Sequence, residues 1–452
     1  MSGQPTPSTI STKQERIAKL AKQMPGTALR SLSHHIDIPW MRGAFVATRK
    51  DGAVGVDRQT AAEFEANLEE NLQGLIDEAK SGLYRAPPVR RVQIPKGKGK
   101  TRPIGIPTFA DKVLQRAAVM ALSPVFEEDF YDFSYGFRPG RSAHNALDAL
   151  WNATMSVGGG WVLDVDVRSF FDSLDRGICR DLLKQRVSDG VLVRLVGKWL
   201  NAGVLEGGVV RRPTKGTPQG GVISPLLANI YLHYVLDEWW VKKVLPCLHG
   251  RAELIRYADD FVIVFKQERD ARRVQDVLAK RFAKYGLELH PDKTRLVQFT
   301  SPRGGGGDQW RRGKRPETFD FLGFTHYWGP SRKGTPIVKR KTAKDRMARA
   351  VARIAEYCRR ARHEPVAEQA KMLSMKLRGY DAYYGITGNA RALDRFRRMV
   401  RWQWRQWLGR RSQRARLTWD VFMKIWRRYK LPGPRVVHSI QNSAKRQRML
   451  PV

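Results

Sequence analysis

The sequence has little cysteine, few acidic residues and no long hydrophobic run, and each shortage excludes a class of protein. Three cysteines among 452 residues, with no CxxC pair, exclude a disulfide scaffold and argue against a structural zinc site. No apolar run approaches the roughly 20 residues of a transmembrane helix, and residues 1–40 lack the apolar core of a secretory signal. We therefore expect no membrane partner and a cytoplasmic location.

The shortage of acidic residues leaves a large positive charge, and this charge is unevenly placed. The chain holds 82 Lys and Arg against 43 Asp and Glu, a net charge of +39, which indicates a polyanionic partner such as nucleic acid. Residues 331–452 contain 33 of the basic and 7 of the acidic residues. Tryptophans among these arginines argue against a disordered tail and predict rings that stack on bases beside charges that contact phosphates. These tryptophans are Trp402, Trp404, Trp407, Trp419 and Trp426.

The remaining composition predicts a folded protein of two to four domains, at roughly 100–200 residues per domain. Apolar spacing predicts a helix over residues 61–80 and nearly continuous helix over residues 340–410. Residues 89–94 and 104–106 are predicted to be strands joined by a basic turn. One face of the later helical segment carries Leu393, Phe396, Val400, Trp404 and Trp407.

Four aspartates lie at the ends of apolar strands. Residues 160–167 predict a buried strand that ends with Asp164 and Asp166, and residues 254–265 predict a hairpin with Asp259 and Asp260 at its tip. A buried carboxylate is costly unless it is paired or bound to metal, and converging carboxylates suit Mg²⁺. Two such ions about 3.5–4 Å apart would clamp an in-line phosphoryl transfer. For Asp164 alone, a salt bridge to a nearby arginine explains the residue equally well.

These aspartates lie in segments that resemble the motifs of reverse transcriptases. The palm signature of that family is similar to Tyr257-Ala258-Asp259-Asp260, and its first carboxylate motif is similar to residues 164–172. The nucleotide-pocket motif and the primer-contacting segment resemble residues 216–225 and 321–324. Bacterial group II introns encode reverse transcriptases with segments like residues 51–57, 102–107 and 136–142. The resemblance covers residues 45–410 in order and spacing.

The resemblance implies an α+β fold of the right-hand polymerase type, with fingers, a palm built on an antiparallel sheet, and a helical thumb. It implies five segments along the chain. They are an N-terminal extension over 1–44, fingers over 45–160, a palm with finger insertions over 161–330, a thumb or maturase domain over 331–410, and a basic C-terminal segment over 411–452.

The resemblance also assigns the catalytic metal site. It implies that Asp166, Asp259 and Asp260 bind two Mg²⁺ ions, for which Mn²⁺ could substitute, and that the Val167 carbonyl also faces a metal. Asp164 is the alternative ligand on the same strand. Lys293 is implied to protonate the leaving pyrophosphate, and the alternative is an ordinary surface lysine in a turn.

Further residues are implied to hold the nucleotide, the primer and the template. Lys96 and Arg102 would bind the triphosphate, with Lys98 and Lys100 as alternatives to Lys96. Phe171 would stack under the sugar and exclude a ribose 2′-hydroxyl, with Phe170 as its competitor, and Gln219 would line the nucleotide. The residues implied to contact primer or template are Tyr257, Arg138, Phe321, Leu322 and Gly323; for Arg138 the alternative is to organise the fingers.

Residues of the helical segment are candidates for binding RNA. Tyr383 lies in an element that recurs in the maturase domain, where its tyrosines serve the core, the RNA or both. Arginines beside the apolar stripe are the best candidates for phosphate contacts. They are Arg401, Arg405, Arg410 and Arg411.

Taken together, the motifs predict an RNA-directed DNA polymerase that copies intron RNA from a DNA primer with dNTPs. The resemblance implies that it also binds the intron RNA to assist splicing and mobility into target DNA. The sequence to Val452 lacks the Cys/His-bearing endonuclease of longer family members, so we expect the compact class that takes its primer from another source.

Three other functions compete with this prediction. A splicing-only maturase is disfavoured by the intact Asp166, Asp259, Asp260 and Gln219. A domesticated reverse transcriptase in defence or spacer acquisition is disfavoured by the lack of a fused effector domain. A viral RNA-dependent RNA polymerase is disfavoured by Ala258 and the finger motifs.

Overall fold

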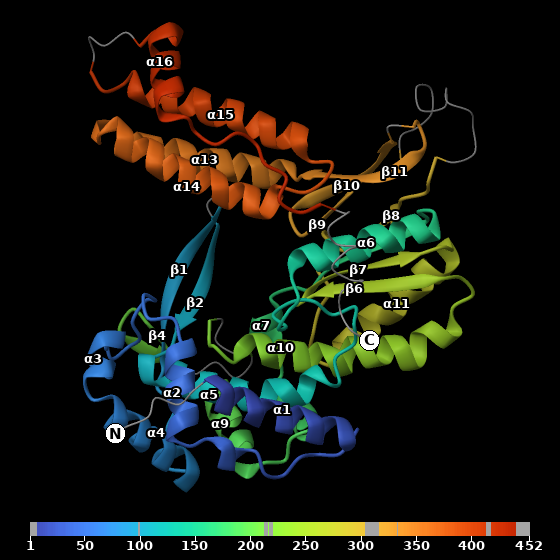
Figure 1. The fold of residues 1–452 in the computed structure, drawn as a ribbon. Coiled ribbons are helices and arrows are strands. Elements are labelled where there is room, and N and C mark those ends of the chain that lie inside the picture. The colour runs from blue at the N-terminus through green and yellow to red at the C-terminus, as the bar shows by residue number, and fades with distance from the viewer. Residues whose placement is uncertain are drawn as a thin grey trace. The chain divides into compact units, whose positions relative to one another are not determined.

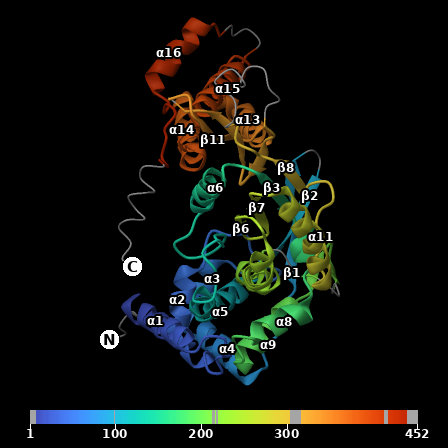
Figure 2. The ribbon, with the colours of Figure 1, turned by 90° about the vertical axis from the view of Figure 1, so that its right-hand side faces the viewer.

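The computed structural model describes residues 7–97, 100–211, 216, 220–302, 316–331, 333–412 and 417–439. The chain divides into two compact units (Figures 1 and 2). Unit 1 comprises Met1–Ala146 and Leu163–Leu296, and unit 2 comprises Leu147–Val162 and Val297–Val452. Within these described ranges, no helix has both the length and the apolar character that a membrane crossing requires.

Unit 1 begins with helices gathered around one buried helix, α5 (Phe109–Glu127). Thr108 caps α5, and most of the side chains of α5 are buried, with α1 and α2 packed against it. The helix predicted over 61–80 is present but interrupted at Asn67, so that it forms α3 and α4. Thr60 and Glu63 close a capping box that starts α3. The surrounding helices are α1 (Pro7–Gln23), α2 (Ile38–Ala47), α3 (Ala61–Ala66) and α4 (Leu68–Ser81).

The predicted basic hairpin is confirmed and belongs to a small sheet. Strand β1 (Val89–Gly97) pairs antiparallel with β2 (Lys100–Ile106), with Ile94 opposite Arg102. The sheet order is β2-β1-β4-β5, where β4 is Val204–Glu206 and β5 is Val209–Arg211. This sheet carries Arg102 at an exposed position.

A second sheet carries the aspartates, in the order β6-β7-β3-β8. Strands β6 (Ala252–Tyr257) and β7 (Asp260–Phe265) form the predicted hairpin, with Tyr257 opposite Asp260. β3 spans Trp161–Asp166 and β8 spans Arg295–Gln298. Helix α11 (Glu268–Lys284) packs against β7 (Figure 1). Because Phe261–Phe265 are all buried, this hairpin is a rigid support for its own tip.

Four further helices complete unit 1. They are α7 (Phe170–Ser173), α8 (Arg176–Lys184), α9 (Gly190–Leu200) and α10 (Ser224–Leu232). Short π and 3₁₀ turns continue α10 through His233–Asp237, Trp240–Val244 and Leu245–Cys247, and another 3₁₀ turn spans Ser33–His35. Nearly every side chain of α10 is buried, which makes it a central helix of the unit.

Unit 2 combines a three-stranded sheet with a helical bundle. The sheet order is β11-β10-β9, with β9 at Phe319–Phe321, β10 at Phe324–Pro330 and β11 at Pro336–Thr342. The helices are α13 (Lys344–Arg360), α14 (Val366–Tyr384), α15 (Ala390–Leu408) and α16 (Trp419–Tyr429), with a 3₁₀ turn at Ala361–His363. Helix α6 (Ala143–Val157) begins in unit 1 and continues into unit 2.

The apolar stripe predicted for the helical segment forms the core of unit 2. Leu393, Phe396, Val400 and Trp404 are buried together, and Trp407 is partly buried against the same cluster. Their spacing of three and four residues places them on one face of α15, which packs on α13. The helices predicted over 340–410 are confirmed from Lys344 to Leu408, with breaks at residues 361–365 and 385–389, whereas residues 340–342 belong to β11.

Candidate active site and nucleic-acid interface

Asp166 and Lys293 meet where strand β3 ends. The Lys293 ammonium donates to Asp166 Oδ2 at 2.8 Å. Backbone hydrogen bonds hold the two segments together, because His290 N donates to the Asp166 carbonyl at 2.8 Å and Val167 bridges Leu289. The contact with the Lys293 ammonium shows that Asp166 Oδ2 can accept a positively charged partner.

Asp259 lies beside Asp166 at the tip of the β6–β7 hairpin. Burial raises the pKa of the Asp259 carboxyl above its ordinary value, and the negative charge of Asp166 raises it further. The positive charges of Arg102 and Arg256 act in the opposite direction. The tertiary structure thus brings Asp166 into contact with Lys293 and places Asp259 within electrostatic range of Asp166 and Arg102, although these residues lie far apart in the sequence.

The expected cage of three converging carboxylates is not formed. Across the described ranges, no three His, Cys, Asp or Glu side chains gather closely enough to hold a metal ion. The Asp166 side chain is turned to Lys293, and Asp260 is exposed on β7. Mg²⁺ usually binds one or two carboxylates and completes its shell with waters and substrate phosphates. Asp166 and Asp259 therefore fit such an ion.

Asp164 and Val167 are held by contacts within the protein. Asp164 Oδ2 accepts a hydrogen bond from Arg295 at 3.1 Å, which is the salt bridge considered as the alternative for this residue. Val167 is buried, and its backbone bridges Leu289. A metal contact from the Val167 carbonyl remains a prediction.

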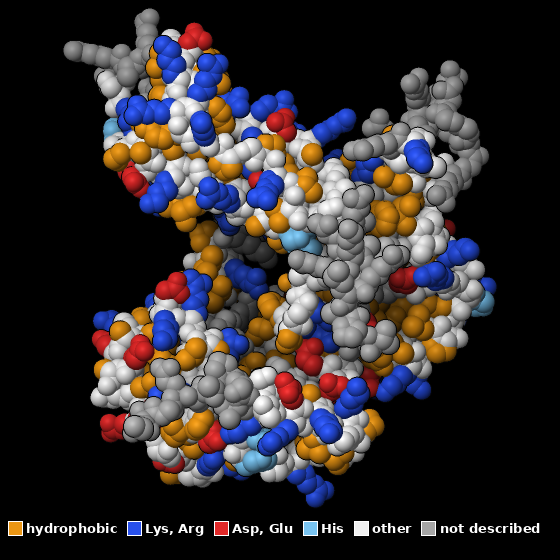
Figure 3. Space-filling view, viewed as in Figure 1, with side chains coloured by type: hydrophobic (Ala, Val, Ile, Leu, Met, Phe, Trp, Pro, Cys, Tyr) orange, Lys and Arg blue, Asp and Glu red, His pale blue; other side chains and the backbone are white. Residues whose placement is uncertain are grey.

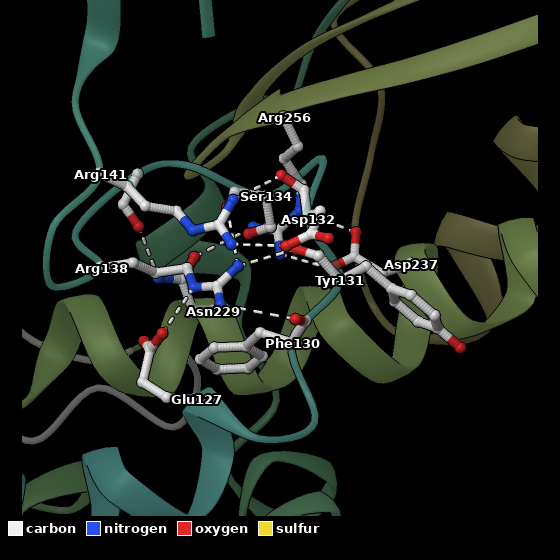
Figure 4. Close-up of polar contacts among 11 residues, drawn as sticks. Glu127, Phe130, Tyr131, Asp132, Ser134, Arg138, Arg141, Asn229, Asp237 and Arg256 are labelled. Atoms are coloured by element: carbon white, nitrogen blue, oxygen red, sulfur yellow. Dashed lines mark hydrogen bonds and ion pairs between the residues drawn. The ribbon is translucent and has the colours of Figure 1, made fainter. Parts of the chain in front are cut away.

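A fully buried arginine supports the aspartate-bearing turn (Figure 4). Arg256 forms a bidentate ion pair with Asp237, and both side chains are 0% exposed. The same guanidinium donates to Asn229 Oδ1 at 3.0 Å and to the Ala258 carbonyl at 3.1 Å. Ala258 has a φ of 57°, a left-handed conformation that is unfavourable for alanine. Arg256 therefore stabilises the backbone immediately before Asp259.

A loop from the finger segment closes on the same turn. Asn229 Nδ2 donates to the Gly136 carbonyl at 2.7 Å, and a Cβ at Gly136 would collide with the Ala258 backbone nitrogen. Sequence reasoning missed Asn229, Asp237 and Arg256. The available signal was a charged residue, Arg256, in the middle of an apolar strand.

Arg138 has a structural role, which corrects the prediction of a template contact. Its side chain is buried and donates to Glu127 at 2.9 Å and to the carbonyls of Tyr131 and Ser134 at 2.7 and 2.8 Å (Figure 4). Burial lowers the pKa of Arg138. With its guanidinium occupied by these acceptors, Arg138 organises its loop, which was the alternative considered for it.

The structure separates the two phenylalanines that compete for the sugar-stacking role. Phe170 is 2% exposed and packs against Tyr231, with ring centroids 6.2 Å apart. Phe171 is partly exposed and meets Phe170 edge to face at 5.3 Å. Phe170 therefore belongs to the core, and Phe171 is the ring that a ligand can reach. Tyr257 lies 6.3 Å from the ring of the exposed Phe137.

Part of the predicted nucleotide pocket lies outside the described residues. This applies to Gln219, to Lys98 and to the side chains of Lys96 and Lys100, although Lys96 falls within β1. Gly220, with a φ of 119°, is described, and a Cβ there would collide with the Gly105 carbonyl of β2. The segment that follows Gln219 thus rests on the strand that carries Arg102.

A buried polar network holds the same segment from the other side. Gln115 Oε1 accepts from Ile223 N at 3.2 Å, and Gln115 Nε2 donates to Asp111 Oδ2 at 3.0 Å. Tyr84 and Trp199 donate to the other oxygen of Asp111, the latter at 2.7 Å. Burial raises the pKa of Asp111 to about 6. This network was not predicted from the sequence.

In unit 2 the predicted primer-contacting segment forms a tight turn. Leu322 and Gly323 connect β9 to β10 with φ values of 47° and 80°, while Phe321 is buried. Tyr383 donates from its hydroxyl to the Leu322 carbonyl at 2.9 Å, and its ring stacks on Phe324 at 5.9 Å. Tyr383 therefore serves packing, and an additional RNA contact from this partly exposed residue remains a prediction.

The arginines predicted to bind RNA mostly contact tryptophans and carbonyls of unit 2. Arg401 lies 4.5 Å from the Trp426 ring, and Arg405 lies 4.5 Å from the Trp419 ring. These contacts tie α15 to α16. Over these helices, Lys and Arg side chains interleave with hydrophobic ones (Figure 3). Arg401 and Arg405 thus have a structural role in unit 2, and a phosphate contact from either residue remains a prediction.

Arg410 and Arg411 differ from each other. Arg411 donates to the carbonyls of Arg362 and Glu364, so it joins the end of α15 to the turn before α14, and a phosphate contact from it remains a prediction. Arg410 is exposed and stacks on Trp407 at 4.9 Å. A phosphate contact from Arg410 remains a prediction.

Residues 94–326 match the family model described as "Reverse transcriptase (RNA-dependent DNA polymerase)". The matched range contains Asp166, Asp259 and Lys293, and it also contains Arg256 with its buried partners. It covers just over half of the chain.

Several individual proteins also have sequences similar to this chain. Protein YkfC of Escherichia coli is 36% identical over 291 residues, covering 57% of this chain and 76% of that protein. Group II intron-encoded protein LtrA of Lactococcus lactis is 42% identical over 294 residues, covering 52% of this chain and 48% of that protein. The putative COX1/OXI3 intron 1 protein of Saccharomyces cerevisiae is 35% identical over 277 residues, covering 51% and 33%. The chain thus spans about half of the Lactococcus protein and a third of the yeast protein.

Proposed function

The chain belongs to the reverse transcriptase family, and from this premise we propose that it extends a DNA primer on an RNA template with Mg²⁺ and dNTPs. In this proposal Asp166 and Asp259 bind the Mg²⁺. Members of this family are RNA-directed DNA polymerases that generally use divalent metal ions. The observation that carries the proposal is the contact of Asp166 with Lys293, with Asp259 within electrostatic range of both Asp166 and Arg102.

Each residue of this site has a proposed part in the transfer. The primer 3′-hydroxyl loses its proton to water, its oxygen attacks the α-phosphorus of the dNTP, the bond from that phosphorus to the bridging oxygen breaks, and pyrophosphate leaves. Asp166 and Asp259 would hold Mg²⁺, with Asp260 as the further ligand that the motif implies. Bound there, the ion supplies Lewis acidity to the attacking and leaving oxygens. Mn²⁺ would substitute for it, because both ions accept carboxylate and water oxygens.

Positively charged and aromatic residues would complete the site. Arg102, together with Lys96, would bind the triphosphate, and Lys293 would give a proton to the leaving pyrophosphate. Phe171 and Gln219 would hold the sugar and base of the dNTP. Tyr257 would pack against the primer end, and the Phe321–Gly323 turn would contact the primer. The family segments follow as fingers over 45–160, palm over 161–330 and thumb over 331–410.

We also propose that the chain binds group II intron RNA and assists its splicing and its mobility into target DNA. The support is the net positive charge of residues 331–452 and the likeness to an intron-encoded protein. We propose a cytoplasmic, nucleic-acid-associated location, because the proposed substrates are RNA and DNA.

A primer-extension assay on oligo-primed RNA tests the polymerase proposal. Asp259→Ala/Asp260→Ala should lose at least about a thousandfold in rate, because metal ligation supplies several kcal/mol of transition-state stabilisation. Asp276→Ala, an exposed aspartate of α11, is the matched control and should extend like wild type. Extension that survives the double substitution would refute the metal assignment. Splicing of a precursor RNA, measured beside extension, separates the polymerase from the maturase role.

A further inference from the structure

Unit 2 contains a groove between α13 and α15 that the roles above leave unexplained. Its volume is about 630 Å³. Five of its lining residues lie on the face of α15 opposite to the buried stripe, where residues three and four positions apart are neighbours. The groove is lined by Val351, Arg395, Arg398, Met399, Trp402 and Gln403.

The groove combines an accessible aromatic ring with positive charge. Trp402 is 50% exposed, whereas Trp404, two residues later on the same helix, is fully buried. Arg395 and Arg398 are exposed beside the ring. The Arg398 guanidinium lies 3.5 Å from Asp394, and a pair this exposed contributes so little that a phosphate can replace the carboxylate. The apolar floor from Val351 and Met399 supports a flat, uncharged group.

We propose that this groove binds one unpaired nucleotide of a folded RNA, with the base stacked on Trp402 and the flanking phosphates on Arg395 and Arg398. The Gln403 amide reaches the edge of the base, since it offers both a donor and an acceptor. This inference deepens the proposed RNA-binding function and rests on it, because that function supplies the RNA.

The size and chemistry of the groove select this occupant. Sites for single small molecules measure about 300–1,000 Å³, and a groove of about 630 Å³ is therefore large enough for one nucleotide. In a duplex, neighbouring base pairs cover the faces of each base, so only an unpaired base offers a free face to Trp402. The two arginines match the negative charge on both sides of such a nucleotide.

Fluorescence anisotropy with two labelled RNA probes tests the proposal on the full chain. One probe is a hairpin with a loop of unpaired uridines, and the other is a blunt duplex with the same number of phosphates. Trp402→Ala should raise the hairpin Kd about tenfold or more, while the duplex Kd changes by less than about twofold. Trp402→Phe keeps an aromatic ring and is the control for misfolding of Trp402→Ala. It should recover most of the hairpin affinity.

Two further variants locate the effect. Arg395→Gln/Arg398→Gln should weaken the binding of both probes and lower the slope of log Kd against log salt by about one to two. Trp419→Ala is the matched control, because Trp419 is 45% exposed in the same unit but its ring already stacks with Arg405. It should leave the hairpin Kd within about twofold of wild type.

Three outcomes would refute the proposed nucleotide site in this groove. They are an unchanged hairpin Kd for Trp402→Ala, an equal loss of hairpin and duplex binding for Trp402→Ala, and a Trp402→Phe variant as weak as Trp402→Ala. Binding of the two probes by wild type separates the two levels of inference. A wild-type protein that binds neither probe refutes the proposed RNA-binding function, whereas a wild-type protein that binds both probes while Trp402→Ala changes neither Kd refutes the groove alone.

Discussion

The Arg256 guanidinium donates a 3.1 Å hydrogen bond to the carbonyl of Ala258, the residue that precedes Asp259. Its other donors are occupied by Asp237 and Asn229, so the arginine is fully used inside the protein. A buried ion pair of this kind gives little net stability, because the lost hydration offsets the attraction between the charges. Its effect is to hold one backbone conformation at the turn that carries Asp259.

Substitution of Arg256 should therefore change the Mg²⁺ dependence of primer extension more than it changes the stability of the fold. Arg256→Lys keeps the charge but loses the bidentate geometry, so we expect primer extension to fall about 10–100-fold and to need more Mg²⁺ for half-maximal rate. The control is Arg281→Lys, because Arg281 also donates to backbone carbonyls, those of Tyr234 and Val235. The control should leave the Mg²⁺ dependence as in wild type. Equal Mg²⁺ dependence in both variants would remove the positioning role of Arg256.

Lys293 should matter for catalysis and little for stability. Its ion pair with Asp166 joins two half-exposed side chains, and such pairs contribute about 0–1 kcal/mol. Lys293→Met should therefore leave the free energy of unfolding within about 1 kcal/mol, while kcat should fall by about 10²-fold or more through loss of the general acid. Lys284→Met, at the exposed end of α11, is the control for a lost surface lysine. An unchanged kcat for Lys293→Met would leave Lys293 as an ordinary surface residue.

The stability of unit 1 should depend on pH through Asp111. Burial raises the pKa of Asp111 to about 6, above the value of 3.8 for an ordinary carboxyl, so the folded state binds more protons between these two values. Its contribution to stability is therefore full below about pH 4 and is lost as pH rises through about 6. Relative to Asp111→Asn, wild type should lose about 1 kcal/mol between pH 5 and pH 7 in urea unfolding.

Asp189 provides the matched control for this titration. Asp189 is also buried, but the backbone N–H groups of Leu32, Ser33 and Leu192 help to lower its pKa below the ordinary value despite burial. Its titration thus lies below pH 4, and stability from Asp189 is lost only as pH falls through that lower range. The difference between wild type and Asp189→Asn should stay constant from pH 5 to pH 7. The same constancy for Asp111→Asn would contradict the assignment.

Arg401 and Arg405 should stabilise unit 2 more than they bind RNA. Each guanidinium stacks on a tryptophan of α16, and such contacts contribute about 0.5–2 kcal/mol. Arg401→Ala/Arg405→Ala should therefore lower the melting temperature. Lys424→Ala/Arg427→Ala, two exposed residues of α16, should weaken RNA binding without that loss. A melting temperature that is equal in the two double variants would contradict the structural role.

Phe171 should control the choice between deoxynucleotides and ribonucleotides. Phe171→Ala opens space beside the sugar, so incorporation of ribonucleotides should rise relative to deoxynucleotides in primer extension. Phe170→Leu is the control, because Phe170 is buried against Tyr231 and its substitution should reduce stability without changing sugar selection. A Phe171→Ala variant that still rejects ribonucleotides would refute the role of this ring.

Local sequence patterns predicted the helices and strands well where apolar residues recur with a regular helical or strand spacing. The Asp259 hairpin, the basic hairpin at Arg102 and the stripe from Leu393 to Trp404 all follow from alternation or from three-and-four spacing. The break at Asn67 was not predicted, because apolar spacing continues through it. Burial of charged side chains was also not predicted, since it depends on partners far away in the chain.

The sequence by itself determined the family, the strands that carry Asp166 and Asp259, and a basic helical segment, because these depend on short-range order and spacing. Only the tertiary structure decided which charges face solvent. Arg138 looks like a surface cation in the sequence, yet it is buried and donates to acceptors within the protein. A charged group is stable in such a place only when the fold surrounds it with acceptors, and that arrangement arises from contacts between distant segments.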